Sequence, residues 1–558
     1  MIELKYVYKE IPNIESIKVI SNKFNINQYI AAILIQNLGF DVDKIYDFLE
    51  PSLEKLYDPF LIKGMNKAVD MILNYIQNSE KILIYGDYDV DGITGIAVLY
   101  NFLIDNFNVS NNLYYKCANR FNEGYGLSKE TIDFAVENNI KLIITVDCGT
   151  KDYEMIKLAK KLGINIIVTD HHEFGDEENL ADVILNNKDK SEDNIYPFKE
   201  LSGCGMVFKL IQGLTKKCNL NNNIPYNYLD LVALSTSCDL VPLIDENRVL
   251  LYYGINKINK NPQIGIKSLL NILNKSFISN EDLLFKVGPC INAPGRISNA
   301  EICVNLFTTK DENEADKFAI LVREEHNNRK KICSDIINDI LDKIDNNNNS
   351  KSTVLYKEGW PIGVLGIIAI RCIEKKNVPT IILTNKDNEY IIGSVRSIQG
   401  LNILKVLSTC SEYIERYGGH EMAAGLLLKK DKLNDFITKF EDNVSKILKT
   451  VDCTKKIEIN IKVPLSKVDR EMFLSLIKLA PFGIGNKGPL FMSNVNIVKC
   501  EYYYSDTYLT LKDKNNKEYL GFYRGSKINI TGNVQIVYNI MCKRDILLNI
   551  VDIKIITF

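Results

Sequence analysis

The sequence has no apolar run long enough to cross a lipid bilayer, which excludes a protein built from membrane-spanning helices. It has no CxxC pair among its 13 cysteines, so neither a disulfide framework nor a zinc ribbon is expected. Neither charge is in excess, because 68 Lys and Arg residues stand against 70 Asp and Glu residues. Any nucleic-acid partner would therefore have to be held by a local basic groove or by metal ions.

The amino-terminal residues, MIELKYVYKEIPNIES, alternate charged and apolar side chains, whereas a signal peptide carries one uninterrupted apolar stretch. We therefore expect no export. The scattered cysteines fit a compartment in which thiols stay reduced, so the predicted location is cytoplasmic.

A length of 558 residues is too great for one hydrophobic core, so a multidomain protein is expected, and its patterning is of the α/β class. The spacing of apolar residues predicts five parts. They are a helical lead-in at 1–65, an α/β domain at 66–310, a connecting helix and polar linker at 311–350, a second α/β domain at 351–450 and a small OB-like β-barrel at 451–558.

The first α/β domain is predicted to contain a parallel sheet. Short β-branched runs (KILIY, KLIITV and NIIVT) are separated by amphipathic stretches of helical length. Each of these three runs is followed by an acid: Asp87, Asp147 and Asp170. Since ligands of such sheets bind beyond the carboxyl ends of the strands, the acids are candidate site residues.

Three carboxylates alternate in the segment GDYDVDG after the first predicted strand: Asp87, Asp89 and Asp91. Carboxylates at this spacing can converge on hard cations such as Mg²⁺ or Mn²⁺. An EF-hand loop begins in the same way, but it requires a Glu at the position of Val98 and a preceding helix. An acidic surface turn remains an alternative for the segment taken by itself.

Later elements also end in polar residues. Asp147 lies in TVDCG, and His171 and His172 follow the acid of VTDHHE. Asp239 stands where an apolar element gives way to a loop. Adjacent histidines are often an exposed polar turn, but here two of only 4 histidines lie beside a strand-end acid. Four separated acidic sites at element ends favour a metal centre.

These residues occur in four ordered motifs, GDYDVDG, TVDCG, DHH and LVALSTSCDLVPL, which are similar to those of the DHH phosphoesterases. Other segments resemble RecJ-like exonucleases within that superfamily, from about Ile26 to the carboxyl end: LYDPFLIKGMNKAVDMI, NRFNEGYGL, LSGCGMVFKL, INAPGR, GSVRS, GGHEMAAG and PFGIGN. The resemblance implies a parallel-sheet DHH domain, a long helix, an α/β DHHA1 domain and an OB-like nucleic-acid-binding domain.

The resemblance also implies a two-metal centre for Mn²⁺ or Mg²⁺. Its implied ligands are Asp89, Asp91, Asp147, His171 and Asp239, with Asp147 bridging. Asp87 and His172 are implied to orient metal, water or substrate. Two cations about 3.5 to 4 Å apart would activate a water molecule and stabilise the leaving oxygen of an in-line displacement. Because an imidazole coordinates only when neutral, activity is expected to fall toward acidic pH.

Candidate substrate contacts lie in glycine-containing segments. Arg120, Arg296 and Arg396 could each offer bidentate donors to phosphate, although a solvated surface charge is the alternative for any one of them. The resemblance implies that they bind, with Ser394, the terminal 5′-phosphate and neighbouring backbone. His420 in GGHEMAAG could contact a phosphate or be a packed histidine in a glycine-rich turn.

The implied function is single-strand-specific 5′-to-3′ DNA exonuclease activity that releases 5′-mononucleotides in recombination and repair. Single-stranded DNA is the implied partner, together with a single-strand-binding protein and a helicase. Tyrosines and lysines of the predicted barrel suit base stacking, although strand tyrosines are more often cross-strand packing pairs.

Alternatives of other classes stay open. One is a DHH phosphodiesterase for short oligonucleotides or cyclic dinucleotides, and another is a non-catalytic RecJ-like replication scaffold. A family II pyrophosphatase would share only the metal chemistry. The chain departs from the family at Pro361, where a His is usual, at Ser235, where a Gly is common, and at Cys290, often an Arg. None of these changes removes an implied metal ligand.

Overall fold

The computed structural model describes residues 4–346, 350–504, 507–525, 530–542 and 544–556. The chain divides into two compact units, which are described separately. The larger unit contains residues 57–241 and 253–454, and the smaller unit contains residues 1–56, 242–252 and 455–558. Among the described residues, no helix combines the length and the apolar character that a membrane span requires.

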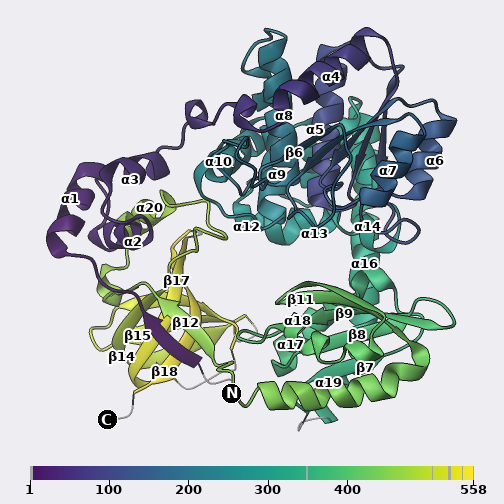
Figure 1. The fold of residues 1–558 in the computed structure, drawn as a ribbon. Coiled ribbons are helices and arrows are strands. Elements are labelled where there is room, and N and C mark those ends of the chain that lie inside the picture. Colours follow the sequence, from purple (N-terminus) through teal and green to yellow (C-terminus); the bar gives the residue numbers. More distant parts are fainter. Residues whose placement is uncertain (1–3, 347–349, 505–506, 526–529, 543, 557–558) are drawn as a thin grey trace. The chain divides into compact units, whose positions relative to one another are not determined.

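The larger unit begins with a five-stranded parallel sheet in the order β3-β2-β4-β5-β6. Figure 1 labels its edge strand β6 and the helices of the same unit. Its strands are β2 Ile82–Gly86, β3 Leu113–Cys117, β4 Leu142–Val146, β5 Asn165–Asp170 and β6 Val183–Asn186. The central strands β2 and β4 are buried along their whole length because helices cover both faces. On one face α6 Lys129–Glu137 and α7 Tyr153–Lys161 contribute to one hydrophobic core, and α5 Val90–Asn106 and α8 Gly203–Lys217 pack on the other.

Further helices complete this part of the unit. They are α4 Met65–Gln77, α9 Leu229–Cys238, α11 Ile264–Ile272, α12 Asn280–Asp282, α13 Gly288–Ile291, α14 Pro294–Ile297 and α15 Glu301–Thr308. Helix α10 Asp245–Lys260 begins in the smaller unit and ends in the larger one. The long helix predicted from the sequence is present as α16 Glu312–Asn346, with 35 residues.

Beyond α16 the larger unit contains a second sheet in the order β10-β11-β9-β8-β7. Its strands are β7 Thr353–Tyr356, β8 Thr380–Asn385, β9 Tyr390–Arg396, β10 Arg416–His420 and β11 Ala423–Lys429. Only the β7–β8 pair is parallel. Its helices are α17 Leu365–Lys376, α18 Ile403–Ser408 and α19 Leu433–Ile447. The predicted multidomain α/β fold with a connecting helix is confirmed.

The smaller unit joins the two ends of the chain. Its strands are β1 Leu4–Tyr8, β12 Lys455–Ile459, β13 Ile461–Lys462, β14 Phe491–Tyr503, β15 Tyr508–Asp513, β16 Glu518–Tyr523, β17 Gly532–Cys542 and β18 Ile546–Ile555. Pairings run from β14 through β15, β16, β18 and β17 back to β14, with β16 and β18 parallel. This order is compatible with the predicted OB-like barrel.

Helices of the smaller unit share a core with these strands. They are α1 Ile14–Phe24, α2 Gln28–Leu38, α3 Val42–Leu49 and α20 Arg470–Ile477. Ile20 and Ile33 of α1 and α2 belong to the same buried cluster as Phe491 and Tyr538 of the strands. The amino-terminal helices and the carboxyl-terminal strands therefore form one hydrophobic core. The boundaries of the five predicted parts remain a proposal.

Candidate functional site

The carboxyl ends of β2, β4 and β5 bring acidic residues to one edge of the parallel sheet. These strands are neighbours, and Gly86, Val146 and Thr169 lie in register. Asp87, Asp147 and Asp170 follow or end the three strands. The edge therefore collects side chains that are far apart in the sequence, as the strand pattern predicts.

Two helices add further carboxylates at this edge. Asp89 is the N-cap of α5 and accepts hydrogen bonds from the amides of Asp91 (2.9 Å) and Gly92 (3.2 Å). Both bonds use Oδ1 of Asp89, so Oδ2 is not committed to the cap. Asp239 is the C-cap of α9. Capping thus fixes the carboxylate of Asp89, whereas Asp239 is held at the end of α9 through its backbone.

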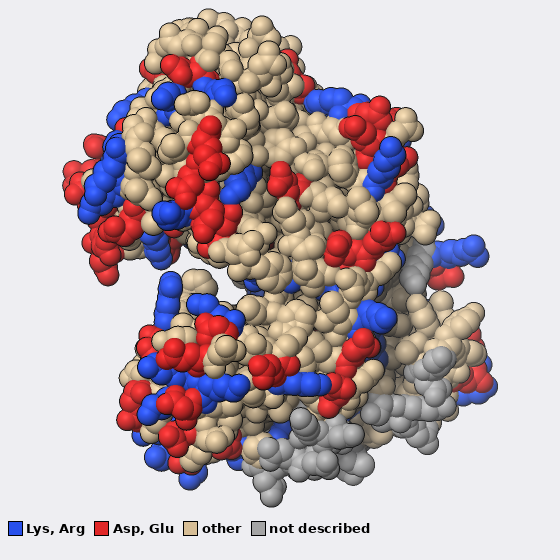
Figure 2. Space-filling model, turned by 90° about the vertical axis from the view of Figure 1, so that its right-hand side faces the viewer, with Lys and Arg blue, Asp and Glu red and all other residues tan. Residues whose placement is uncertain are grey.

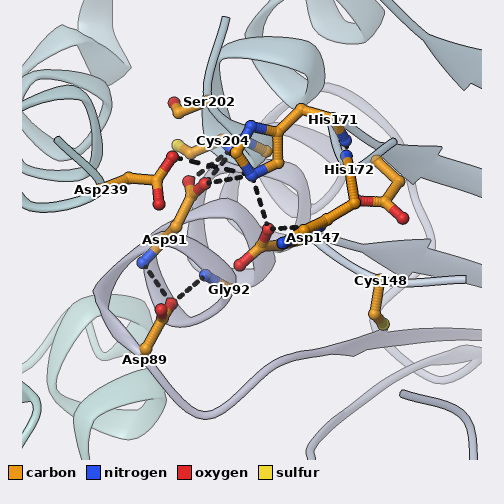
Figure 3. Close-up of polar contacts among 12 residues, drawn as sticks. Asp89, Asp91, Gly92, Asp147, Cys148, His171, His172, Ser202, Cys204 and Asp239 are labelled. Atoms are coloured by element: carbon orange, nitrogen blue, oxygen red, sulfur yellow. Dashed lines mark hydrogen bonds and ion pairs between the residues drawn. The ribbon is translucent and has the colours of Figure 1, made fainter. Parts of the chain in front are cut away.

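The imidazole of His171 stands among three carboxylates (Figure 3). Its Nε2 is 3.2 Å from Oδ1 of Asp147, 3.6 Å from Oδ2 of Asp239 and 3.7 Å from Oδ2 of Asp91. His171 is 8% exposed and Asp91 is 1% exposed. These groups come from four different elements, so the tertiary fold and not local sequence produces the convergence.

Possible ligand atoms form three overlapping groups, in each of which all atoms lie within 4.8 Å of one another. The groups are Asp147, His171 and His172; Asp91, His171 and Asp239; and Asp87, Asp89 and Asp147. Asp147 and His171 each belong to two groups. We call Asp87, Asp89, Asp91, Asp147, His171 and Asp239 the carboxylate cluster. Its overlapping groups have the composition that adjacent oxygen- and nitrogen-rich cation sites require.

Several atoms of the cluster are buried without any hydrogen-bond partner among the described residues. They are Oδ1 of Asp87, Oδ1 of Asp147, Oδ2 of Asp239 and Nε2 of His171. Burial, and next the charge of Asp91, raises the pKa of Asp147 and of Asp239 well above the ordinary range. Burial lowers the pKa of His171. Orphaned acceptors and a neutral imidazole fit divalent cations, which would satisfy these atoms and offset the negative charge.

Asp91 is held by a dense set of donors. Its carboxylate accepts hydrogen bonds from the amides of Gly203 (2.6 Å) and Cys204 (2.7 Å) at the start of α8, and from the hydroxyl of Ser235 (2.6 Å). A Cβ at Gly203 would lie 2.7 Å from Cβ of Asp147, so only glycine allows α8 to approach so closely. The amino terminus of α8 therefore orients one carboxylate while leaving room for another.

Two residues position His172, of which the sequence marks Asp170 as a candidate acid and gives no indication of Tyr125. Nδ1 of His172 lies 2.8 Å from Oδ1 of Asp170 and 3.0 Å from the hydroxyl of Tyr125. Burial lowers the pKa of His172, but the hydrogen bond and charge of Asp170 outweigh it and raise that pKa. Tyr125 also donates to the carbonyl of Asp147 at 3.2 Å. Asp170 was visible as a strand-end acid, and Tyr125 lies in the segment NRFNEGYGL that contains Arg120.

A cavity of about 690 Å³ lies in the same unit and brings together four of the five predicted substrate residues. We call it the arginine pocket, after Arg120, Arg296 and Arg396, which line it together with Ser394. Nη1 of Arg396 donates to the hydroxyl of Ser394 at 2.9 Å, and Nη1 of Arg296 donates to the carbonyl of Gly363 at 3.2 Å. The pocket thus combines strands of the second sheet with a loop after β3 and with α14.

The arginine pocket and the carboxylate cluster influence each other electrostatically. The guanidinium of Arg120 lies over the ring of Tyr88, 4.2 Å from the ring centroid. Tyr88 stands between Asp87 and Asp89 in the sequence. Burial raises the pKa of Asp87, as does Asp89, and Arg120 partly counteracts this. Burial and the neighbouring Arg120 lower the pKa of Arg296 to about 10.

His420 lies apart from this arrangement. It ends β10, is exposed, and is not among the residues that line the arginine pocket, although Gly418 and Gly419 are. Its predicted phosphate contact therefore remains a proposal. Elsewhere the charges are mixed, since Figure 2 shows acidic and basic side chains interspersed over one face of the molecule.

Two family models match the larger unit. The model described as the DHH family, N-terminal domain, matches residues 81–236, and the DHHA1 domain matches residues 349–446. The single-stranded-DNA-specific exonuclease RecJ of Bacillus subtilis is 33% identical over 483 residues, which cover 86% of this chain and 60% of that relative. The chain thus spans less than two thirds of that relative's length. RecJ of Escherichia coli is 33% identical over 421 residues, which cover 72% of each chain.

Solved structures agree with these matches. The crystal structure of Thermus thermophilus RecJ in complex with Mn²⁺ is similar with a TM-score of 0.84 at 21% identity, over 100% of this chain and 80% of that one. A RecJ bound to manganese is similar with a TM-score of 0.61 at 26% identity, over 71% of this chain and 97% of that one. From its sequence and its fold, the chain belongs to the RecJ family of single-stranded-DNA-specific exonucleases.

Proposed function

We propose that this chain hydrolyses single-stranded DNA from the 5′ end and releases 5′-mononucleotides with the help of two divalent metal ions, Mn²⁺ or Mg²⁺. The observation that carries the proposal is the carboxylate cluster, in which three buried oxygens, on Asp87, Asp147 and Asp239, have no hydrogen-bond partner among the described residues. Its RecJ relatives are named as exonucleases specific for single-stranded DNA.

Five residues would hold the metal ions: Asp89, Asp91, Asp147, His171 and Asp239. Asp147 would be shared, because its carboxylate belongs to one group with Asp87 and Asp89 and to another with the histidines. Bound divalent cations supply Lewis acidity, which lowers the pKa of water and neutralises phosphate oxygens. The protein's own part is to hold these ligands deprotonated and oriented, as the donors around Asp91 do.

His172 and the arginines would act on the strand itself. The side chain of His172 is 43% exposed, and its Nδ1 is held by Asp170, which leaves Nε2 as the ring atom able to contact a phosphate. Arg120, Arg296 and Arg396 would bind the terminal 5′-phosphate and adjacent phosphates through N–H donors. A pocket that binds an end would favour cleavage from that end, which gives the proposed 5′-to-3′ polarity.

The strands of the smaller unit would add affinity for single strands. Tyr503 and Tyr504 are 45% and 83% exposed at the end of β14, where rings could stack on bases. We further propose action in recombination and repair in the cytoplasm, with a single-strand-binding protein and a helicase as partners. The 13 cysteines form no disulfide, which supports a reducing compartment.

The test is degradation of single-stranded DNA that carries a label at its 5′ or 3′ end, with Mn²⁺, Mg²⁺ or a chelator. Immediate release of the 5′ label as a mononucleotide, dependent on metal and absent with duplex DNA, is the expected result. Early release of the 3′ label would contradict the proposed polarity.

Two outcomes would favour the alternatives. Rapid cleavage of dinucleotides without degradation of long strands would indicate a DHH phosphodiesterase for short substrates. Retained binding of single strands with no turnover of any substrate would indicate a scaffold. RNA of the same sequence serves as the control that tests whether degradation requires deoxyribose.

A further inference from the structure

A second cavity in the larger unit, of about 740 Å³, shares no lining residue with the arginine pocket. It is walled by α16, by α17 and by the segment that runs from the end of α11 to α13. Six cationic side chains line it, and among the described residues no acidic side chain does: Lys275, Lys286, Arg323, Arg329, Lys330 and Arg371. We call this cavity the α16 pocket.

Helical spacing on α16 gathers the cations. Arg323, His326, Lys330 and Ile337 follow one another at intervals of three, four and seven residues, which places them on one face of the helix. Alternating with them on the exposed side are acids such as Glu324, which do not line the cavity. The positive charge is therefore concentrated toward the pocket.

Three of the cations have no acidic counterpart. Within the described chain, Arg323, Arg329 and Lys330 form no ion pair, whereas Lys275 pairs with Asp282 at 2.9 Å and Arg371 pairs with Glu374 at 2.9 Å. The Nε of Arg329 is buried and has no hydrogen-bond partner among those residues. A buried N–H donor on a cation is costly unless an acceptor meets it, so these groups are suited to an anionic ligand.

The pKa of a histidine in the wall of the pocket is lowered by the same excess of positive charge. His326 is 4% exposed, and its Nδ1 lies 3.0 Å from the carbonyl of Pro289. Nη2 of Arg329 lies 3.3 Å from the same nitrogen, so this ring atom lies between a guanidinium donor and a carbonyl acceptor. Burial, together with the charges of Arg329, Lys330 and Arg323, lowers the pKa of His326 to about 4.

One aromatic ring lies among these cations. Phe285 lines the pocket and is 70% exposed, although a phenylalanine in the core would be buried. It belongs to a π-helical turn, Leu283–Val287, a rare conformation that occurs often at functional sites. An exposed ring beside a group of cations combines a stacking surface for a base with donors for phosphates.

We propose that the α16 pocket binds a free nucleotide that carries two or three phosphates, with the phosphates on Arg323, Arg329 and Lys330 and the base on Phe285. A nucleoside polyphosphate is favoured over a monophosphate because three unpaired cations exceed the charge of one phosphate group. A free nucleotide is favoured over a DNA strand because the cavity has the volume of a small-molecule site and is lined separately from the arginine pocket. The site is independent of the proposed exonuclease activity.

The test is equilibrium binding of ATP, inorganic triphosphate and AMP to the full chain by calorimetry, in the presence of a chelator. We expect saturable binding with one ATP per chain, and binding of AMP that is at least about tenfold weaker. The double variant Arg323→Ala/Lys330→Ala should weaken ATP binding by about ten- to hundredfold. Phe285→Ala should weaken binding of ATP but leave binding of inorganic triphosphate unchanged.

The matched control is Lys331→Ala, which removes an exposed lysine from α16 outside the pocket and should leave binding unchanged. If the double variant does not fold, Lys330→Glu at an exposed position replaces it and should abolish binding. Absence of saturable binding, or equal losses in Lys331→Ala and Lys330→Glu, would overturn the proposal. A variant that binds ATP normally but loses affinity for an oligonucleotide would instead assign the cavity to the DNA path.

Discussion

The carboxylate cluster and the arginine pocket lie in one compact unit and carry opposite charge. In the cluster, burial raises the pKa of Asp147 and Asp239, whereas in the pocket it lowers the pKa of Arg296 and Arg396. Both regions therefore bury charged groups whose lost hydration is not fully replaced by groups of opposite charge. Each region thus suits a ligand of opposite charge, for which we propose metal ions in the first and phosphates in the second.

The two regions differ in how the fold builds them. The residues of the cluster lie at the ends of strands of one parallel sheet and at the ends of helices that pack on it. These regular elements hold the carboxylates in place. The pocket draws on loops, on α14 and on β9, which belong to two parts of the sequence joined by α16. Substitutions in the cluster should therefore affect the chemical step, and substitutions in the pocket should affect binding of the strand.

The largest effect is expected from Asp147→Asn, which removes the carboxylate that two groups of ligand atoms share. Asparagine is preferable to alanine because Asp147 has a φ of +59°, which asparagine tolerates. We expect kcat/KM on single-stranded DNA to fall by at least about a thousandfold, or about 4 kcal/mol. Asp133→Asn on the exposed face of α6 is the control, and equal losses in both variants would refute the distinction.

A smaller effect is expected from Arg396→Lys, which keeps the charge but removes the planar fork that matches phosphate. Arg396 lies in the pocket, where its Nη1 also donates to Ser394. KM for a 5′-phosphorylated strand should rise by about ten- to hundredfold with kcat nearly unchanged. A strand with a 5′-hydroxyl should be affected less, with Lys405→Ala as the control. An equal effect on both strands would argue against recognition of the terminal phosphate.

Ser235→Ala should have a moderate effect that added metal can reverse. The hydroxyl of Ser235 donates to Asp91 at 2.6 Å, so its loss would loosen a proposed ligand without removing it. The Mn²⁺ concentration for half-maximal activity should rise by about tenfold, and saturating Mn²⁺ should restore the rate. Ser237→Ala on the same helix, where the hydroxyl lies 3.5 Å from the carbonyl of Asn280, is the control. A loss that Mn²⁺ cannot restore would contradict this role.

The smallest expected effect is on the melting temperature and its dependence on pH. The pKa of Asp147 is raised above the ordinary value of about 3.9, so above that value the folded metal-free protein binds more protons than the unfolded chain. The free energy of unfolding of the metal-free protein therefore falls as the pH rises from about 4 toward the raised pKa of Asp147. Bound metal ions would remove this destabilisation, because they offset the buried negative charge. The Mn²⁺-induced increase in Tm should be a few degrees larger at pH 8 than at pH 5.5.

The Asp147→Asn variant supplies the control for this pH dependence, because it lacks one of the buried charges. Its metal-free Tm should fall less steeply with pH than that of the wild type. An identical slope in the two proteins would show that the carboxylate of Asp147 does not titrate as proposed.

Much of the cluster was predictable because strand ends can be located from local patterns. β-branched runs followed by an acid predict Asp87 and Asp147 at one edge of a parallel sheet, and the structure has them there. The position of Asp239 was harder, because a buried helix and a buried strand share the same apolar pattern, and it proved to cap α9. The α/β fold and the long helix followed from periodicity in the same way.

Other features depend on contacts between distant residues and leave no local signal. In the sequence Ser235 is only a departure from its family, because its bond to Asp91 joins residues 144 positions apart. The shared core of α1, α2 and the carboxyl-terminal strands likewise unites the two ends of the chain. The α16 pocket combines three separated segments, and its cations alone resemble a solvated helix face.

The most direct test of the two-metal centre is the anomalous scattering of Mn²⁺ in crystals of this protein. We expect two peaks at the carboxyl edge of the parallel sheet, with Asp147 contacting both, and the loss of at least one peak in Asp147→Asn. A single peak that is unchanged in Asp147→Asn, or Mn²⁺ bound only outside the carboxylate cluster, would show that the cluster is not a two-metal centre.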